Sequence, residues 1–117
     1  MVTSRETKQL MEQAAEHWRM PFMEFVDDFR FARDPQLIVD PFSKGNERFD
    51  AILASAIEYL GDELGVETPA WVWAVPACKM PWFVAGMESL KAIAIVESPV
   101  YFRRRKIFVL ANFLDRV

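Results

Sequence analysis

The sequence predicts an all-α fold: a single compact domain of about five helices, joined by irregular connections rich in proline and tryptophan. Three observations lead to this prediction. Apolar residues recur at spacings of three and four along most of the chain, 52% of the 117 residues are hydrophobic, and prolines or glycines separate the periodic segments. A chain of this length supports one core, so residues 1–117 are expected to form one domain.

Residues 1–34 are expected to form a pair of helices. Thr3 and Glu6 have the spacing of a capping box at the start of an amphipathic helix, which should end just before Pro21. Pro21 suits the first turn of a second helix. That helix must stop before Asp34, because the residue that precedes a proline avoids the α conformation. The short connection favours an antiparallel arrangement of the two helices.

Residues 35–47 contain two prolines and a glycine and are interpreted as a connector. The best-defined helix follows over residues 49–64, where apolar side chains share one face. Gly65 stands where a left-handed residue commonly ends a helix. Four acidic residues, Asp50, Glu58, Asp62 and Glu63, lie away from the apolar stripe.

A short helix and an irregular segment should follow. Thr68 and Pro69 have the pattern of an N-cap and a first-turn proline, which predicts a helix through Trp73. Pro76 should end this helix. Residues 76–86 are then expected to be irregular but closely packed, because buried backbone groups need hydrogen-bond partners.

Residues 87–97 are predicted to form a buried helix at the centre of the fold. The run 92–96 has no polar face, so the rest of the protein should cover it on most sides. A strand is the alternative, because isoleucine alternates with alanine in this run. The segment is long for a strand, however, and no second convincing strand is present to pair with it.

The last part of the chain predicts one more helix and a turn. Ser98 and Pro99 have the pattern of an N-cap and first helical residue, and this helix should extend to Arg105. Residues 107–109 are interpreted as extended. Asn112 is expected to cap a last turn that ends at the C-terminus.

Motifs for catalysis, metals or cofactors are not found. His17 is the only histidine, which excludes a histidine-rich metal site, and a chain with four glycines contains no phosphate-cradling glycine motif. The acidic pairs Asp27-Asp28 and Asp62-Glu63 lack the spacing of a calcium loop and fit a solvated helix face better. We therefore predict no enzyme activity, no cofactor, and no catalytic or metal-binding residue.

The chain is expected to be soluble and cytoplasmic. Its single cysteine, Cys78, cannot form an internal disulfide, the charged N-terminus lacks a secretory signal, and no apolar run is long enough to cross a membrane. Charge is uneven: residues 1–64 carry seven Lys and Arg against thirteen Asp and Glu, and residues 65–117 carry seven against four. The two halves either complement each other or present an acidic face to a basic partner.

The most distinctive feature is a run of four consecutive cations, Arg103, Arg104, Arg105 and Lys106. Consecutive residues of a helix point about 100° apart, so at least one of the three arginines must turn toward the body. We predict that it is buried against a carboxylate, with Glu97 or Glu88 as the partner. The other cations are either solvated or contact phosphate or an acidic partner.

A second group of interaction candidates consists of three tryptophans within twelve residues and an adjoining phenylalanine: Trp71, Trp73, Trp82 and Phe83. Tryptophan is rarely completely buried and is favoured at interfaces. At least one of these rings is therefore expected to stay partly exposed, in an apolar patch used for association. The alternative is that all of them close the base of the helical bundle.

Short motifs in the second half resemble a known bacterial family. They are Arg48-Phe49-Asp50-Ala51, Pro69-Ala70-Trp71, Pro81-Trp82-Phe83, Ser89-Leu90, Glu97-Ser98-Pro99, and Phe102-Arg103-Arg104-Arg105 with Ile107-Phe108. Through them, residues 48–117 are similar to an uncharacterised segment that often follows the helix-turn-helix module of Xre-type regulators, in toxin–antitoxin-like gene neighbourhoods. The resemblance implies the partner-binding half of such a regulator, because the first 46 residues lack the short helices of a DNA-reading module.

We therefore expect a non-enzymatic protein-interaction or regulatory domain, antitoxin-like, that binds a protein partner or forms a homo-oligomer and does not enter membranes. The alternative is a nucleic-acid-binding regulator that uses the basic run 103–106, although a net charge of −3 is unusual for such a domain. A cysteine-dependent enzyme at Cys78 is a third and weaker hypothesis.

Overall fold

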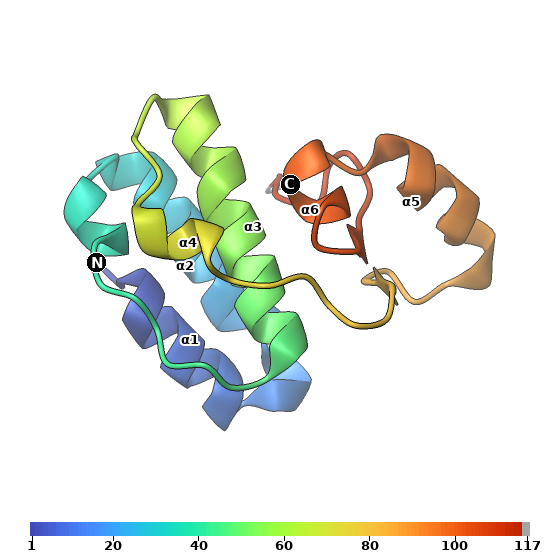
Figure 1. Ribbon diagram of the computed structural model, residues 1–117, viewed down its shortest axis with the longest axis horizontal. Helices are drawn as coiled ribbons and strands as arrows, with labels where there is room; N and C mark the ends of the chain where they lie inside the picture. Colours follow the sequence, from blue (N-terminus) through green and yellow to red (C-terminus); the bar gives the residue numbers. More distant parts are fainter. Residues whose placement is uncertain (116–117) are drawn as a thin grey trace.

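The structure, a computed structural model, describes residues 1–115 and is mostly helical (Figure 1). Its α-helices are α1 (Ser4–Gln13), α2 (Arg19–Ala32), α3 (Glu47–Leu64), α4 (Ala70–Trp73), α5 (Lys91–Glu97) and α6 (Val100–Arg103). Short 3-10 turns occupy Ala15–His17, Pro35–Ile38 and Glu88–Leu90, and the strands are β1 (Trp82–Phe83) and β2 (Ile107–Phe108). The prediction of a mainly helical domain is confirmed, with six α-helices and one two-stranded sheet in these residues.

Helices α1 and α2 form an antiparallel pair. The predicted capping box is present, since Glu6 N–H donates to the Thr3 hydroxyl and Thr3 N–H donates to the Glu6 carboxylate, both at 3.1 Å. The start of α1 is tied to the second half of α2, because Val2 N–H donates to Asp28 Oδ2 at 2.9 Å.

The prediction that the first helix continues almost to Pro21 is wrong. Helix α1 ends at Gln13, a 3-10 turn follows, and α2 already begins at Arg19. The chain turns here because the Trp18 ring packs into the core, 5.5 Å from the Phe22 ring. The spacing of apolar residues continues through this turn, so the sequence carries no local signal for it.

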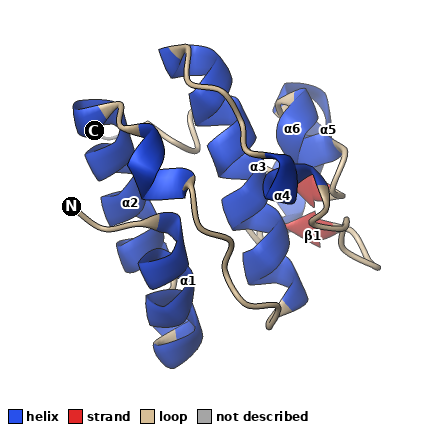
Figure 2. Ribbon diagram, turned by 60° about the vertical axis from the view of Figure 1, so that its left-hand side comes forward, coloured by secondary structure: helices blue, strands red, loops and turns tan. Residues whose placement is uncertain are grey.

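Helix α3 lies at the centre of the molecule, between the α1–α2 pair on one side and α6 on the other (Figures 1 and 2). It begins where Asn46 Oδ1 accepts the backbone N–H groups of Arg48 and Phe49. It ends at Gly65, which has the expected left-handed conformation with φ of 69°.

Two acidic residues of α3 are buried, although they lie away from its apolar stripe. Asp50 is 6% exposed and forms an ion pair with Lys8 of α1, and Glu58 is 2% exposed. Both carboxylates are covered because neighbouring elements pack around α3 and not on one side of it alone.

The second half of the chain is held together by a small parallel sheet, visible in Figure 2. Trp82 pairs with Ile107 and Phe83 with Phe108, and the rings of Phe83 and Phe108 stack with centroids 4.9 Å apart. The extended conformation predicted for residues 107–109 is confirmed at β2. Its partner strand β1 lies in the segment that was expected to be irregular.

Helix α5 is a helix, as predicted, but it is neither buried nor central. Only Ala94 of this helix is buried, with 2% exposure, whereas Val96 is 78% exposed. Helix α5 lies at one end of the molecule (Figure 1), because the much longer α3 takes the central position. The absence of polar residues from the run 92–96 shows that this helix is apolar on all sides. It does not show that other residues of the same chain bury it.

Ser98 caps the end of α5 instead of the start of α6. Its hydroxyl oxygen lies 2.7 Å from the Ala94 carbonyl and 3.0 Å from the Val109 carbonyl, which share its single hydrogen, and it accepts from Val109 N–H at 2.7 Å. The buried hydroxyl therefore joins α5 to the chain that follows β2. The last turn capped by Asn112 was expected to reach Val117, which lies outside the described residues.

Candidate functional site

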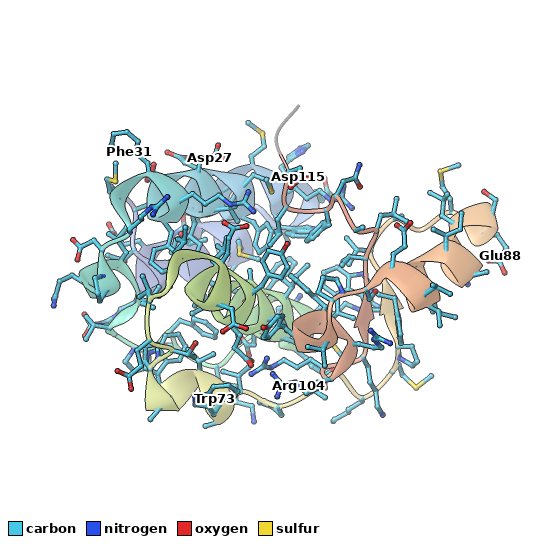
Figure 3. All side chains as sticks on the ribbon, turned by 90° about the horizontal axis from the view of Figure 1, so that it is seen from above. Asp27, Phe31, Trp73, Glu88, Arg104 and Asp115 are labelled. Carbon is cyan, nitrogen blue, oxygen red and sulfur yellow. The ribbon has the colours of Figure 1, made fainter. Side chains whose placement is uncertain are left out.

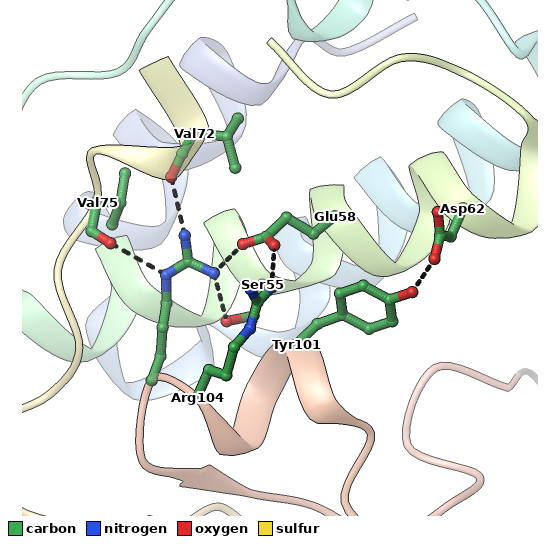
Figure 4. A network of polar contacts seen from close by, with 8 residues as sticks. Ser55, Glu58, Asp62, Val72, Val75, Tyr101 and Arg104 are labelled. Carbon is green, nitrogen blue, oxygen red and sulfur yellow. Dashed lines mark hydrogen bonds and ion pairs between the residues drawn. The ribbon is translucent and has the colours of Figure 1, made fainter. Parts of the chain in front are cut away.

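Arg105 is the arginine that turns toward the body. It is 6% exposed, and its guanidinium forms an ion pair with Glu58 of α3; Figure 4 labels Glu58 and the surrounding residues Ser55, Val72 and Val75. The same guanidinium donates to the backbone carbonyls of Val75 and Val72, at 3.1 and 2.8 Å, and to the hydroxyl of Ser55. The prediction of a buried arginine–carboxylate pair is confirmed.

The predicted partner of that arginine is wrong. Glu97 accepts Ala111 N–H at 3.0 Å, and Glu88 pairs with Lys91 at 3.0 Å. Glu58 takes the arginine because the packing of α6 on α3 brings the two together across a sequence separation of 47 residues. Glu58 is thus a key residue that the sequence analysis missed, and its position away from the apolar stripe gave no signal for this role.

The other cations of the run have three different surroundings. Arg104 is about half exposed and also forms an ion pair with Glu58, while its guanidinium lies 5.6 Å from the centre of the Trp73 ring. Arg103 donates to the Ser98 carbonyl at 2.9 Å and is exposed. Lys106 is exposed and has a positive φ of 61° at the turn into β2. Two of the four cations therefore share one buried carboxylate.

The four aromatic candidates are placed in separate surroundings. Trp71 is half-buried and donates its indole N–H to the Ile38 carbonyl at 3.1 Å, Trp82 packs on Trp18 with centroids 5.5 Å apart, and Phe83 stacks on Phe108 as described above. Trp73 is 57% exposed, beside Arg104 in Figure 3. The expectation that one ring stays partly exposed is therefore met by Trp73.

The largest uncovered apolar group along one stretch of chain lies on and beside α5. Its members are Met87, Ile93, Ile95, Val96 and Val100, all of them exposed. We call these five residues the α5 face. Figure 3 shows this part of the chain extending away from the body toward Glu88. The run 92–96 belongs to this group, and its apolar character had predicted burial.

The α5 face is bordered by charges of both signs. Lys91 Nζ lies 3.0 Å from Glu88 Oε2, at the start of the helix, and Glu97 lies at its end. The helix itself is fixed in place by the burial of Ala94 and by the hydrogen bonds of Ser98. These contacts therefore anchor the backbone of α5 to the rest of the chain.

Cys78 and His17 do not have the surroundings of a catalytic pair. Cys78 is buried, and burial, together with the negative charge of Glu47, raises the pKa of its thiol. Its thiolate is therefore disfavoured at neutral pH. His17 is exposed on the 3-10 turn between α1 and α2.

Within residues 1–115, no three His, Cys, Asp or Glu side chains come together in a group that could hold a metal ion. None of the helices in this part of the chain is long and apolar enough to cross a membrane.

The chain matches no family model, no curated protein and no solved structure. The similarity of residues 48–117 to a segment of Xre-type regulators stays a prediction.

Proposed function

We propose that this chain is a non-enzymatic protein-interaction domain with a regulatory, antitoxin-like role, and that a protein partner docks on the α5 face. The observation that carries this proposal is the exposure of the α5 face itself. Five large apolar side chains between residues 87 and 100 remain exposed, and a concentration of exposed apolar side chains is a mark of an interaction site.

The charges around the α5 face favour a protein as the occupant. Glu88 and Glu97 lie at its two ends and Lys91 lies between them. Arg103 also lies at the end of α5, where it donates to the Ser98 carbonyl, so this rim carries two cations and two carboxylates and has no net positive charge to attract an anionic membrane or a nucleic acid. A protein surface with an apolar centre and a rim of mixed charge has the matching composition.

The state of the basic run also supports a protein partner over nucleic acid. Arg105 is buried and Arg104 shares the Glu58 carboxylate with it. Affinity for nucleic acid depends on the number of phosphates neutralised by available cations, and the ion pairs with Glu58 lower that number here. The raised pKa of the Cys78 thiol counts against nucleophilic catalysis.

Co-purification from the native host with matched variants tests the proposal. We expect the tagged chain to retain a protein partner that Val96→Asp retains at least about tenfold less, because a carboxylate in an apolar interface is left unpaired. Val39→Asp is the matched control, since Val39 is also an exposed valine but lies outside the α5 face. The proposal is contradicted if both variants retain the same proteins as the unaltered chain.

A further inference from the structure

We infer that Arg104 anchors a binding pocket for a carboxylate carried by the protein partner. The pocket has a volume of about 180 Å³. It is lined from α3, α4 and the segments that follow α4 and α6, by Glu58, Trp73, Val75, Ala77, Arg104 and Arg105. It lies outside the α5 face, so it would be a second point of contact.

The Arg104 guanidinium is held in position by three contacts. One nitrogen, Nη2, forms the ion pair with Glu58, which is itself 2% exposed. The guanidinium also lies 5.6 Å from the centre of the Trp73 ring and 5.9 Å from that of the Tyr101 ring. A side chain oriented in this way loses little conformational freedom when a ligand binds.

The part of the Arg104 guanidinium that remains available suits a carboxylate. Its Nε and Nη1 groups have no hydrogen-bond acceptor among the described residues, and the side chain is about half exposed. A carboxylate binds an arginine fork through Nη2 together with either Nε or Nη1, as Glu63 binds Nε and Nη2 of Arg30. A ligand of Arg104 would therefore use one of the two free groups and the second hydrogen of Nη2. One Glu58 against Arg104 and Arg105 leaves a net positive charge in the pocket, which favours an anion.

Arg105 cannot serve the same purpose. It is buried, and its donors are engaged by Glu58, Ser55 and two backbone carbonyls. The two neighbouring arginines therefore have different roles: Arg105 fixes the Glu58 carboxylate, and Glu58 in turn orients Arg104. This division explains why a buried carboxylate has two guanidinium partners.

A protein carboxylate suits this pocket better than a polyphosphate. A single available guanidinium offers one anion site, whereas nucleic acids bind through several cations, and the chain as a whole has a net charge of −3. The exposed Trp73 ring beside Arg104 adds an apolar contact. We take the carboxylate to belong to a protein because of the function proposed above, and we expect an apolar residue beside it.

Titration of the full-length chain with a capped peptide of alternating glutamate and leucine tests this site. We expect saturable binding by calorimetry, with a change in tryptophan fluorescence as Trp73 is covered. Arg104→Gln should weaken binding at least about tenfold, because the charge and both donors are lost. Arg103→Gln should bind like the unaltered chain, since Arg103 does not line the pocket, and a glutamine–leucine peptide should not bind.

Three further arms complete the test. Arg104→Lys should also bind the peptide more weakly, because one ammonium cannot reproduce the planar fork of a guanidinium. Urea denaturation must show that each variant is folded.

If Arg104→Gln bound the peptide as tightly as the unaltered chain, the proposed site would be overturned. If a single-stranded oligonucleotide bound more tightly than the peptide, and Arg104→Gln weakened that binding, the pocket would be a phosphate site instead. Val96→Asp should still bind the peptide, so failure of the pocket and failure of docking on the α5 face are distinguishable.

Discussion

Arg105 and Arg103 are two residues apart and differ in almost every contact. Arg105 is buried and bonds to Glu58, Ser55 and two backbone carbonyls, whereas Arg103 is exposed and donates to a single carbonyl. The stability lost when a charged side chain is removed depends on whether its partner is left buried and unpaired. At the scale of single residues, the arginine run is therefore not one functional unit.

Alanine substitutions should separate the two arginines. Arg105→Ala leaves Glu58 with a single, half-exposed partner and removes the donors to Val72 and Val75, and we expect it to lower the free energy of unfolding by about 3–5 kcal/mol. Arg103→Ala should cost less than about 1 kcal/mol. Urea denaturation of both variants measures the difference. Two equally mild substitutions would show that the Glu58 pair contributes little to stability.

The thiol of Cys78 gives a second prediction at this scale. Burial raises its pKa, so the thiol should react with iodoacetamide at neutral pH more slowly than free cysteine, and urea should abolish the protection. A raised pKa stabilises the fold below the unfolded pKa of about 8.5, and this contribution is lost as pH rises through the higher folded value. Reaction as fast as free cysteine would revive the hypothesis of a cysteine enzyme.

At the scale of elements, sequence patterns correctly predicted those features that depend on interactions between nearby residues. The capping box of Thr3 and Glu6, the left-handed Gly65 and the extended β2 were all correct, because each depends on residues a few positions apart. The early end of α1 depends instead on Trp18 packing into the core. The pairing of β1 with β2 joins segments 25 residues apart in register, which no local pattern announces.

Ser98 is the residue that fixes α5 to the rest of the chain. Ser98→Ala leaves Val109 N–H without its acceptor and removes the one hydroxyl hydrogen that the Ala94 and Val109 carbonyls share, and we expect a loss of about 1–3 kcal/mol in the free energy of unfolding. Amide hydrogen exchange should accelerate at Val109 and at the end of α5 before it does in α3. If amide exchange accelerated equally throughout the chain, Ser98 would stabilise the whole fold and not α5 in particular.

At the scale of the whole molecule, the buried face of each helix was predictable but the arrangement of the helices was not. The stripe of α2 is buried as expected, with Phe22, Phe25, Val26 and Phe29 in the core. The central position was predicted for α5 but is occupied by α3. The periodicity of apolar residues indicates which side of a helix is apolar, but it does not indicate which elements pack against that helix. The candidate site was therefore predicted in part: the arginine run was found, and Glu58 and the α5 face were not.

The uneven charge of the chain is partly explained by contacts between its two halves. Arg104 and Arg105 from the basic second half meet Glu58 from the acidic first half, and Tyr101 donates to Asp62. These contacts join α6 to α3 (Figure 4) and leave α5 at the edge. Electrostatic contacts thus join the two halves, while the α5 face remains exposed and is the surface on which we propose that a protein partner docks.

Site-specific photo-crosslinking at position 96 tests this central claim most directly. A benzophenone amino acid placed at Val96, in the middle of the α5 face, should give a discrete covalent adduct with a protein when cells of the native host are irradiated. The same amino acid at Val39, an exposed valine outside that face, should give none. The absence of any adduct at position 96, or the same adducts at both positions, would contradict the account.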